Sequence, residues 1–377
     1  MPWKECDRMS QRDEFLRFYQ QNTLSMSELC RRFGVSRKTG YKWVGRFSEG
    51  GLPALADQSR RPRSSPRQTP SEIEDLVVEL RHKHPRWGGR KLRRRLLDLN
   101  YTDVPAASTI TEILRRHGLL EPPERATRDF QRFEREEPND LWQMDFKGHF
   151  ATQSGHRCHP LTVLDDHSRF SLGIRALPGE RELLVRPELE LILRTYGLPR
   201  SILCDHGPPW GCGARGEVTR LSVWLLKQGV EVIHGRPLHP QTQGKEERFH
   251  RSLKAEVLQE RQFSDLSSCQ EAFDVWRPIY NTQRPHEALK MQVPSSRYRP
   301  SPRSYCESPG PWDYGPSAIV RKVMALGRIS FQGARYHVSR GLSGESVCLR
   351  PTEEDGVYGV FFCRSLVTKI DLREARE

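Results

Sequence analysis

Three acidic positions, far apart in the chain, have the setting that metal-dependent chemistry requires. Asp145 lies within the apolar stretch DLWQMDF, Asp205 ends the apolar stretch SILCD, and Glu247 lies with Glu246 in the first turn of an expected helix. An acid at the end of a hydrophobic strand is costly unless it meets a cation or a metal. A hard divalent cation such as Mg²⁺ relieves the repulsion among gathered carboxylates and accepts phosphate oxygens as further ligands. The pattern therefore favours two-ion phosphoryl transfer on a nucleic-acid backbone.

Residues 239–257, HPQTQGKEERFHRSLKAEV, predict a loop that leads into an amphipathic helix. Pro240 and Gly244 interrupt regular structure, and Phe249, Leu253 and Val257 then recur four apart, which is the spacing of one helix face. The remaining surface is strongly basic. The basic residues of this surface are Lys245, Arg248, Arg251 and Lys254. We expect them to face the phosphates of bound DNA. The alternative is an ordinary basic face exposed to solvent.

The segment that must position these acids runs from 139 to 298 and alternates strands with helices. Strands are expected at 141–146, 161–164 and 170–177, followed by a helix at 181–197 that Pro187 should kink or divide. A strand at 202–204, a helix at 218–229 and a strand at 230–235 precede the helix that carries the glutamates. This order predicts an α/β sheet covered by helices on both faces.

Two basic modules are expected ahead of this core. Residues 1–56 predict short helices, and the stretch from Ser25 to Phe47 has the capping, turn and spacing of a helix-turn-helix. A basic linker, 57–68, separates it from a second helix-turn-helix-like module at 69–120, and 121–138 predict another linker. The alternative for the first module is a purely structural three-helix bundle. The alternative for the basic linker is a flexible spacer that does not contact DNA. The candidate DNA-binding residues are Arg37, Lys38, Tyr41, Lys42, Arg60, Arg61, Arg90, Lys91 and Arg94.

The carboxy-terminal part predicts a linker at 299–316 and short strands with glycine turns from 317 to 377. Five such strands suggest a small β-barrel. Its arginines would offer a second DNA surface, and a folding cap or protein-contact module is the alternative.

Composition agrees with a polyanionic partner. The net charge is +13, and residues 1–120 contain 24 Lys and Arg against 14 Asp and Glu, so that most of the excess lies in the first third. Nine cysteines without a CxxC pair argue against a zinc site or a disulfide framework. We expect a cytoplasmic, nucleoid-associated protein of a bacterium, because neither a signal peptide nor an apolar run of membrane-spanning length is evident.

Four stretches, DLWQMDF, ILCDHG, HPQTQGKEERFHRSLK and YNTQRPHEALKMQVPSSRY, resemble the integrase core of insertion-sequence transposases, in the superfamily of DDE transposases and retroviral integrases. The resemblance implies an RNase H-like core and two Mg²⁺ or Mn²⁺ ions held by Asp145, Asp205 and Glu247. The family pattern places its acid directly before an Arg-Phe pair, which selects Glu247 over Glu246. The implied activity is cleavage at element ends and transfer of 3′-hydroxyl groups into target DNA.

The same resemblance implies the partners and leaves alternatives. Terminal inverted repeats and target DNA would be bound by a homodimer or a higher multimer. Where the family has Asn-Gly after its second aspartate, this chain has His206-Gly207-Pro208-Pro209, and His206 is expected to hydrogen-bond as Asn would. A DNA-binding regulator with an inactive core, a host RNase H-like nuclease and a degraded transposase copy are the other interpretations. Asp165 and Asp166 resemble a turn of the family that is usually structural.

Overall fold

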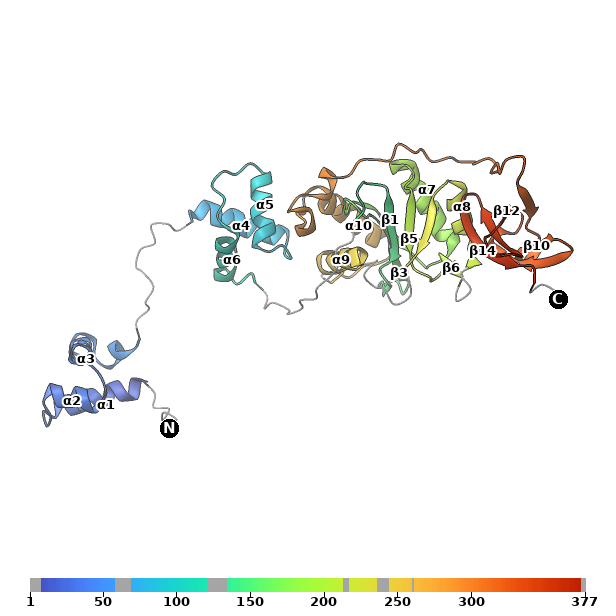
Figure 1. Ribbon diagram of the computed structural model, residues 1–377. Helices are drawn as coiled ribbons and strands as arrows, with labels where there is room; N and C mark the ends of the chain where they lie inside the picture. Colours follow the sequence, from blue (N-terminus) through green and yellow to red (C-terminus); the bar gives the residue numbers. More distant parts are fainter. Residues whose placement is uncertain are drawn as a thin grey trace. The chain divides into compact units, whose positions relative to one another are not determined.

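The computed structural model describes residues 8–57, 69–120, 134–212, 217–235, 244–259 and 261–373 (Figure 1). The chain divides into two compact units, Met1–Gln68 and Thr69–Glu377, which are treated separately below. Two of the candidate DNA-binding residues, Arg60 and Arg61, lie outside the described residues.

The first unit contains the helices α1 (Arg8–Gln20), α2 (Met26–Arg32) and α3 (Arg37–Gly50), followed by the 3-10 helix η1 (Leu52–Leu55). Ser25 and Glu28 form a reciprocal capping box at the start of α2, and the Ser36 side chain accepts a hydrogen bond from the N–H of Thr39 at the start of α3. Gly34 turns the chain between them with a φ of 64°, a conformation that favours glycine. The small core is formed by Phe15, Leu16, Leu29, Cys30 and Leu55.

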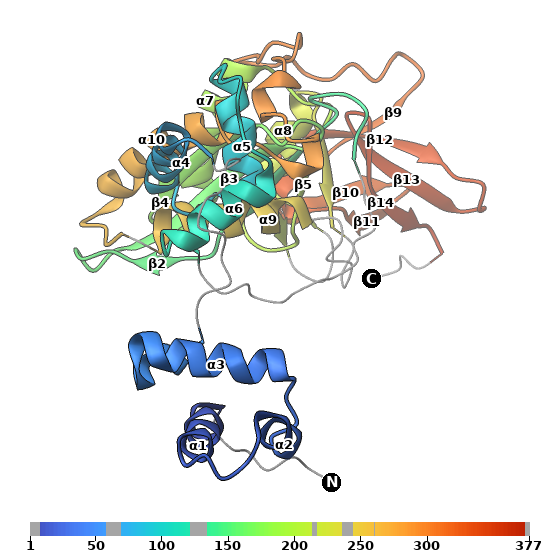
Figure 2. The same cartoon turned by 90° about the vertical axis from the view of Figure 1, so that its left-hand side faces the viewer.

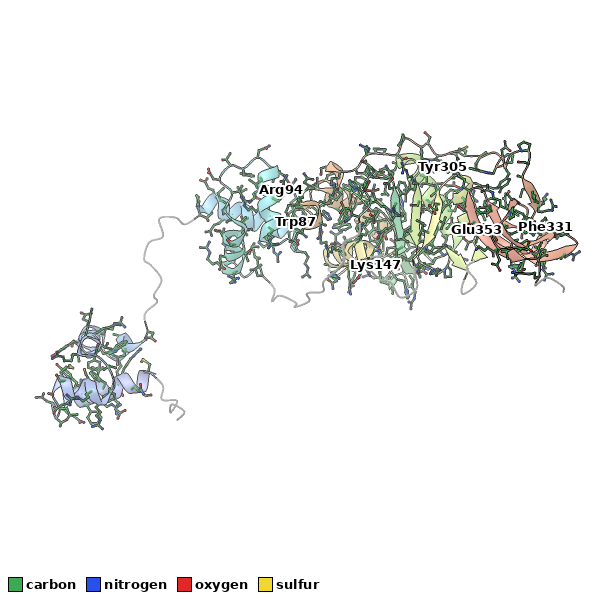
Figure 3. All side chains as sticks on the ribbon, viewed as in Figure 1. Trp87, Arg94, Lys147, Tyr305, Phe331 and Glu353 are labelled. Atoms are coloured by element: carbon green, nitrogen blue, oxygen red, sulfur yellow. The ribbon has the colours of Figure 1, made fainter. Side chains whose placement is uncertain are left out.

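The second unit begins with a helical module, which consists of α4 (Ser71–Lys83), α5 (Gly89–Asp98) and α6 (Ala107–Arg116). These helices pack around the fully buried ring of Trp87, whereas Arg94 lies on the outer side of α5 (Figure 3). Gly89 has no room for a side chain, because an added Cβ would lie 2.4 Å from the carbonyl oxygen of Ala107. The close approach of α5 to α6 therefore depends on that glycine.

A mixed sheet forms the centre of the second unit. Its strands follow the order β2-β3-β1-β5-β8, and β4 pairs with β3. The strands β1 and β5 are parallel, as are β5 and β8, whereas β3 is antiparallel to both β1 and β4. The bounds are β1 (Leu141–Phe146), β2 (Phe150–Ala151), β3 (Arg157–Asp165), β4 (Ser171–Leu177), β5 (Ser201–Cys204) and β8 (Glu231–His234).

Helices cover both faces of this sheet, as the sequence predicted. One face, with Trp142 and Met144, packs against α7 (Glu182–Tyr196) and α8 (Arg220–Lys227). The other face packs against α9 (Gly244–Leu253), the π-helical turn η4 (Lys254–Leu258) and α10 (Leu266–Thr282). Because side chains alternate along a strand, Asp145 lies on the α9 side, opposite to Met144.

The helix around Pro187 differs from the expectation. It is one uninterrupted helix, α7, with Pro187 inside it. The hydrogen bond that proline cannot donate would go to the carbonyl group of Leu183 in the first turn of the helix. Leu183 is strongly exposed, so water can satisfy that carbonyl group without a break in the helix.

The carboxy-terminal strands are present, but the predicted small β-barrel is not confirmed. In the described residues they form a four-stranded antiparallel sheet, β14-β13-β12-β9, and a separate hairpin, β10-β11. The turn η7 (Ala325–Gly327), in which Leu326 has a φ of 65°, leads the chain away from β9, so that only one bridge, Met324 to Arg328, joins that segment to β10. The bounds are β9 (Ile319–Lys322), β10 (Arg328–Phe331), β11 (Ala334–His337), β12 (Ser346–Pro351), β13 (Val357–Phe362) and β14 (Ser365–Asp371).

This β module belongs to the second unit because it shares a core with α8. Val223 and Leu226 of α8 join the apolar cluster of the strands, and Lys227 forms an ion pair of 2.6 Å with Glu345. The strands lie beside α8 in both ribbon views (Figures 1 and 2). A short hairpin, β6 (Gly211–Cys212) and β7 (Glu217–Val218), leads into α8.

Candidate active site

Asp145 and Asp205 lie at the ends of two neighbouring parallel strands. The register pairs Gln143 of β1 with Leu203 of β5, so two residues further along each strand the aspartates come side by side. The N–H of Phe146 donates a hydrogen bond of 2.8 Å to Asp145 Oδ1. Burial, and after it the negative charge of Asp205, raise the pKa of Asp145 to about 6. The structure therefore brings together the first two acids that the sequence predicted.

The loop after β5 holds Asp205 through backbone groups. The N–H of Gly207 donates to Asp205 Oδ1 at 3.0 Å, and His234 Nδ1 is 2.8 Å from the carbonyl oxygen of Asp205. His206 hydrogen-bonds through Nε2 to the carbonyl oxygen of Gly235, at 2.7 Å, and stacks on His234. His206 thus links this loop to the end of β8.

The two glutamates of α9 have opposite environments. Glu246 is only 1% exposed, and its Oε2 lies 3.1 Å from Thr162 Oγ1 and 3.5 Å from His250 Nε2. Its Oε1 has no hydrogen-bond partner among the described residues. Burial, and then the charge of Asp145, raise the pKa of Glu246 well above its usual value. The side chain of Glu247 is 62% exposed and pairs with Arg251 at 3.3 Å.

The two glutamates therefore lie on different sides of α9. The sequence pattern grouped Glu247 with the two aspartates, whereas the acid that the structure places on the Asp145 side of the helix is Glu246. The physical reason is the rotation of the helix: Phe249 and Leu253 are buried against the sheet, and Glu246 precedes them by three and seven residues on the same stripe. That spacing was visible in the sequence and could have identified Glu246 as the inward-facing acid.

Two neighbouring groups that the sequence analysis did not select complete this interior cluster. Thr162 lies on β3 opposite Asp145, and its Oγ1 is 2.8 Å from His250 Nε2. His250 Nδ1 is 4.0 Å from Asp145 Oδ2, and burial lowers the pKa of His250 to about 3. A threonine within an apolar strand and a histidine four residues after an acid are weak signals by themselves, because each is common in structural settings.

The Asp165-Asp166 turn has a structural environment. Asp165 Oδ1 accepts hydrogen bonds from the N–H and the hydroxyl group of Ser168, and Asp166 Oδ1 lies 2.5 Å from Lys245 Nζ. Burial first, and then the charge of Arg169, lower the pKa of Lys245 to about 8. The expectation that Lys245 faces DNA phosphates therefore needs correction, because its ammonium group joins the start of α9 to this turn.

The other candidate DNA-binding residues fall into two groups. Those of α3 are exposed, as are Arg248 and Arg251 on α9, Lys254 at the start of η4 and Arg90 on α5. Lys91 is packed near Arg284, Glu256 and Glu287, and burial lowers its pKa to about 8, which is a second departure from the prediction. Arg94 forms an ion pair of 2.8 Å with Asp98.

No group of three or more His, Cys, Asp and Glu side chains in the described ranges is arranged to hold a metal ion. The described helices include none with the length and apolar character needed to cross a membrane.

Family models match most segments of the chain. Models of a helix-turn-helix domain and a homeodomain-like domain match residues 11–63 and 39–114. Two models of an integrase core domain match residues 135–240 and 228–294. A model of the IS481 family transposase C-terminal domain matches residues 318–377. These matches define the class of protein: helix-turn-helix domains joined to an integrase core.

Two curated relatives identify the family. The chain is 30% identical over 225 residues to the uncharacterized 31.7 kDa protein of insertion element IS407 from Burkholderia multivorans. This alignment covers 58% of this chain and 78% of the relative. It is 28% identical over 295 residues to the uncharacterized 39.2 kDa protein of insertion element IS476 from Xanthomonas euvesicatoria, and this alignment covers 76% of each chain. The chain belongs to the insertion-sequence transposases with an integrase core, as its motifs predicted.

Solved structures with some likeness are retroviral. A catalytic core domain of HTLV-2 integrase in complex with magnesium aligns with a TM-score of 0.34 and 14% identity, over 44% of this chain and 99% of that chain. A chain of the simian T-cell lymphotropic virus intasome aligns with a TM-score of 0.38 and 15% identity, over 78% of this chain and 99% of that chain.

Proposed function

We propose that this transposase binds the terminal inverted repeats of its element, cleaves the DNA ends by metal-dependent hydrolysis and transfers the 3′-hydroxyl ends into target DNA. The observation that carries the proposal is the juxtaposition of Asp145 and Asp205 at the ends of adjacent parallel strands, where the charge of Asp205 disfavours the ionised form of Asp145. This arrangement is costly for folding and useful for holding a divalent cation. Family membership supplies the substrate class.

The donor set fits Mg²⁺ or Mn²⁺ chemically. Carboxylate oxygens are the ligands that these ions prefer, and Asp145 and Asp205 offer them at the carboxyl ends of the neighbouring strands β1 and β5. When bound there, a pair of such ions activates the attacking water or 3′-hydroxyl group and stabilises the leaving 3′-oxygen. The Gly207 N–H orients the Asp205 carboxylate, and the Phe146 N–H orients that of Asp145.

We propose Glu247 as the third acid of the site. Glu246 is enclosed by protein, and a hydrated ion that must also accept phosphate oxygens has little access to it. Glu247, Arg251 and Lys254 share one exposed face of the helix at spacings of four and seven. Lys254 also lines a cavity together with Lys147, two residues after Asp145, so this face borders the aspartates. A rearrangement of the first turn of α9 would bring Glu247 toward them.

A nicking assay tests the proposal. Its substrate is a duplex that carries the terminal repeat, and the repeat sequence is identified from the DNA that flanks the gene. We expect Mg²⁺-dependent nicking, and at least a 10³-fold loss in Asp205→Asn, because the ligand supports several kcal/mol of transition-state stabilisation. Glu353→Gln, at an exposed position of the C-terminal module, is the matched control and should nick normally. Specific binding without nicking in either metal would instead indicate a regulator with an inactive core.

A pair of variants distinguishes the two glutamates. We expect Glu247→Gln to lose nicking as Asp205→Asn does. Glu246→Gln keeps the shape of the buried side chain and should retain activity within about tenfold. The reverse order of effects would assign the third position to Glu246.

A further inference from the structure

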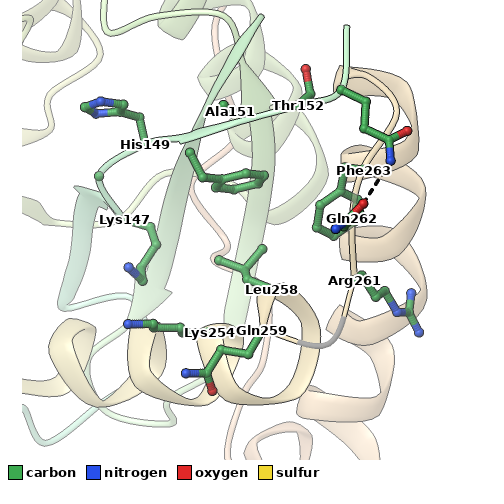
Figure 4. A pocket seen from close by; sticks show the side chains of 13 residues that line it. Lys147, His149, Ala151, Thr152, Lys254, Leu258, Gln259, Arg261, Gln262 and Phe263 are labelled. Atoms are coloured by element: carbon green, nitrogen blue, oxygen red, sulfur yellow. Dashed lines mark hydrogen bonds between the residues drawn. The ribbon is translucent and has the colours of Figure 1, made fainter. Parts of the chain in front are cut away.

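A cavity of about 590 Å³ lies beside the acids, between the β1-β2 connection and the end of α9 (Figure 4). It is lined by residues 147–153 on one side and by Lys254, Leu258, Gln259 and residues 261–263 on the other. Its volume lies within the range of pockets that hold a small organic ligand. Lys147 is only two residues from Asp145, so one end of the cavity adjoins the proposed scissile position.

The end of the cavity nearest the acids is cationic. Lys147 and Lys254 point into the same space from opposite walls (Figure 4). Neither lysine has a salt bridge among the described residues. None of the thirteen lining residues is acidic. Two ammonium groups that face one another across the cavity favour an anion between them.

The interior of the cavity is apolar, and its far end carries amides. Phe150 and Leu258 both line the cavity, and the Phe150 ring packs against Phe263, with ring centroids 5.7 Å apart. Gln153 Nε2 donates to Gln262 Oε1 at 3.1 Å across the far end, and the Gln259 amide lies near the lysines. A flat, apolar surface bordered by amide donors and acceptors suits a nucleobase.

We propose that this cavity binds one unpaired nucleotide of the DNA strand that passes the acids. Its phosphate lies between Lys147 and Lys254, and its base packs on Phe150 and Leu258. Stacking on an aromatic side chain is worth about 1–3 kcal/mol per base and tolerates any base, so the pocket would hold the strand without reading a sequence. This inference rests on the proposed function, because it assumes that DNA approaches Asp145 and Asp205.

Photo-crosslinking of the full chain tests the pocket without any cleavage step. The probe is a single strand of ten thymidine nucleotides in which one base is replaced by 5-iodouracil, added to the Asp205→Asn chain without divalent metal. After irradiation and tryptic digestion, we expect mass spectrometry to find the crosslink on Phe150. Lys147→Ala combined with Lys254→Ala should lower that yield at least fivefold, and Leu258→Trp, which fills the cavity, should do the same.

Lys369→Ala on β14 is the matched control, since it removes one exposed lysine outside the pocket and should leave the Phe150 yield within twofold. Circular dichroism of each variant separates loss of the pocket from loss of the fold. Crosslinks confined to residues outside the cavity, or a Phe150 yield that the lysine and Leu258 variants leave unchanged, overturn the proposal. If the unchanged chain nicks DNA but the Phe150 crosslink is absent, only the nucleotide pocket is refuted. If the crosslink forms but the unchanged chain does not nick DNA, the proposed function is refuted.

Discussion

The two basic helices α3 and α5 have similar composition and different surroundings. On α3, Arg37, Lys38, Tyr41 and Lys42 are exposed, and the Tyr41 side chain presents 58% of its area to solvent. On α5, each basic side chain that follows Arg90 has a protein neighbour. Lys91 is packed near Glu256 and Glu287, and the charge partner of Arg94 is Asp98. A basic helix face therefore predicts an acidic or polar partner, but the partner can be the protein itself.

The contacts of α5 explain this difference. Arg95 Nη2 donates to Gln283 Oε1 at 3.3 Å, and Arg90 lies 3.5 Å from Glu287, so residues at and after the end of α10 meet the helix. Ile279 of α10 also packs against the core cluster of the helical module. The positive charge of α5 thus helps to attach the module to the integrase core. We propose that α3, rather than α5, is the first DNA-recognition helix.

The largest expected effect concerns His84, at the end of α4. It stacks on Trp87 with ring centroids 3.8 Å apart, and burial lowers its pKa from 6.5 to about 4. Because the pKa is lower in the folded chain than in the unfolded chain, His84 stabilises the protein fully above pH 6.5, and this contribution is lost as the pH falls through 4. His84→Phe keeps the stack and removes the titration.

We expect the free energy of unfolding of His84→Phe, relative to the unchanged chain, to rise by up to about 3 kcal/mol between pH 7 and pH 4. Urea unfolding at pH 7, 5.5 and 4 measures it. His82→Phe, at an exposed position of the same helix, is the control and should show little pH-dependent difference. A constant difference for His84→Phe across that range would mean that the helical module does not enclose His84.

The next effect concerns DNA affinity. Replacement of Arg37, Lys38 and Lys42 by Ala should weaken binding to a terminal-repeat duplex at 50 mM salt and flatten its salt dependence. Because each phosphate contact costs about half a decade of affinity between 50 and 200 mM salt, the loss of affinity over that range should become roughly 30-fold smaller. Fluorescence anisotropy across that salt range measures both quantities. An unchanged salt slope would show that α3 does not contact phosphates, and the comparison with α5 would then fail.

The smallest effect comes from a matched pair of single changes. Lys91→Met on α5 removes a packed charge, and we expect DNA affinity to stay within about twofold while the free energy of unfolding changes by no more than about 1 kcal/mol, in the stabilising direction. Lys38→Met on α3 removes the same charge from an exposed position and should lower DNA affinity about threefold at unchanged stability. Equal losses of affinity in both variants would mean that α5 also binds DNA.

Much of the fold was predictable from local patterns. Ser25 and Ser36 cap helices where the sequence places them, and the alternation of strands and helices predicted a sheet covered on both faces. Strand propensity also indicated the carboxy-terminal β module but not its pairing. Closure into a barrel depends on which strand edges meet, and the turn at Leu326 determines that here.

The sequence by itself determined the family, the acids available for chemistry and the helical position of the two glutamates. Only the tertiary structure decided which charges are used inside the protein: Glu246 turns toward Asp145, Lys245 pairs with Asp166, and Lys91 packs near Glu256 and Glu287. The physical reason is that residue type fixes a charge, whereas its partner is fixed by the packing of elements distant in sequence. Burial then alters the cost of that charge, as the raised pKa of Asp145 shows.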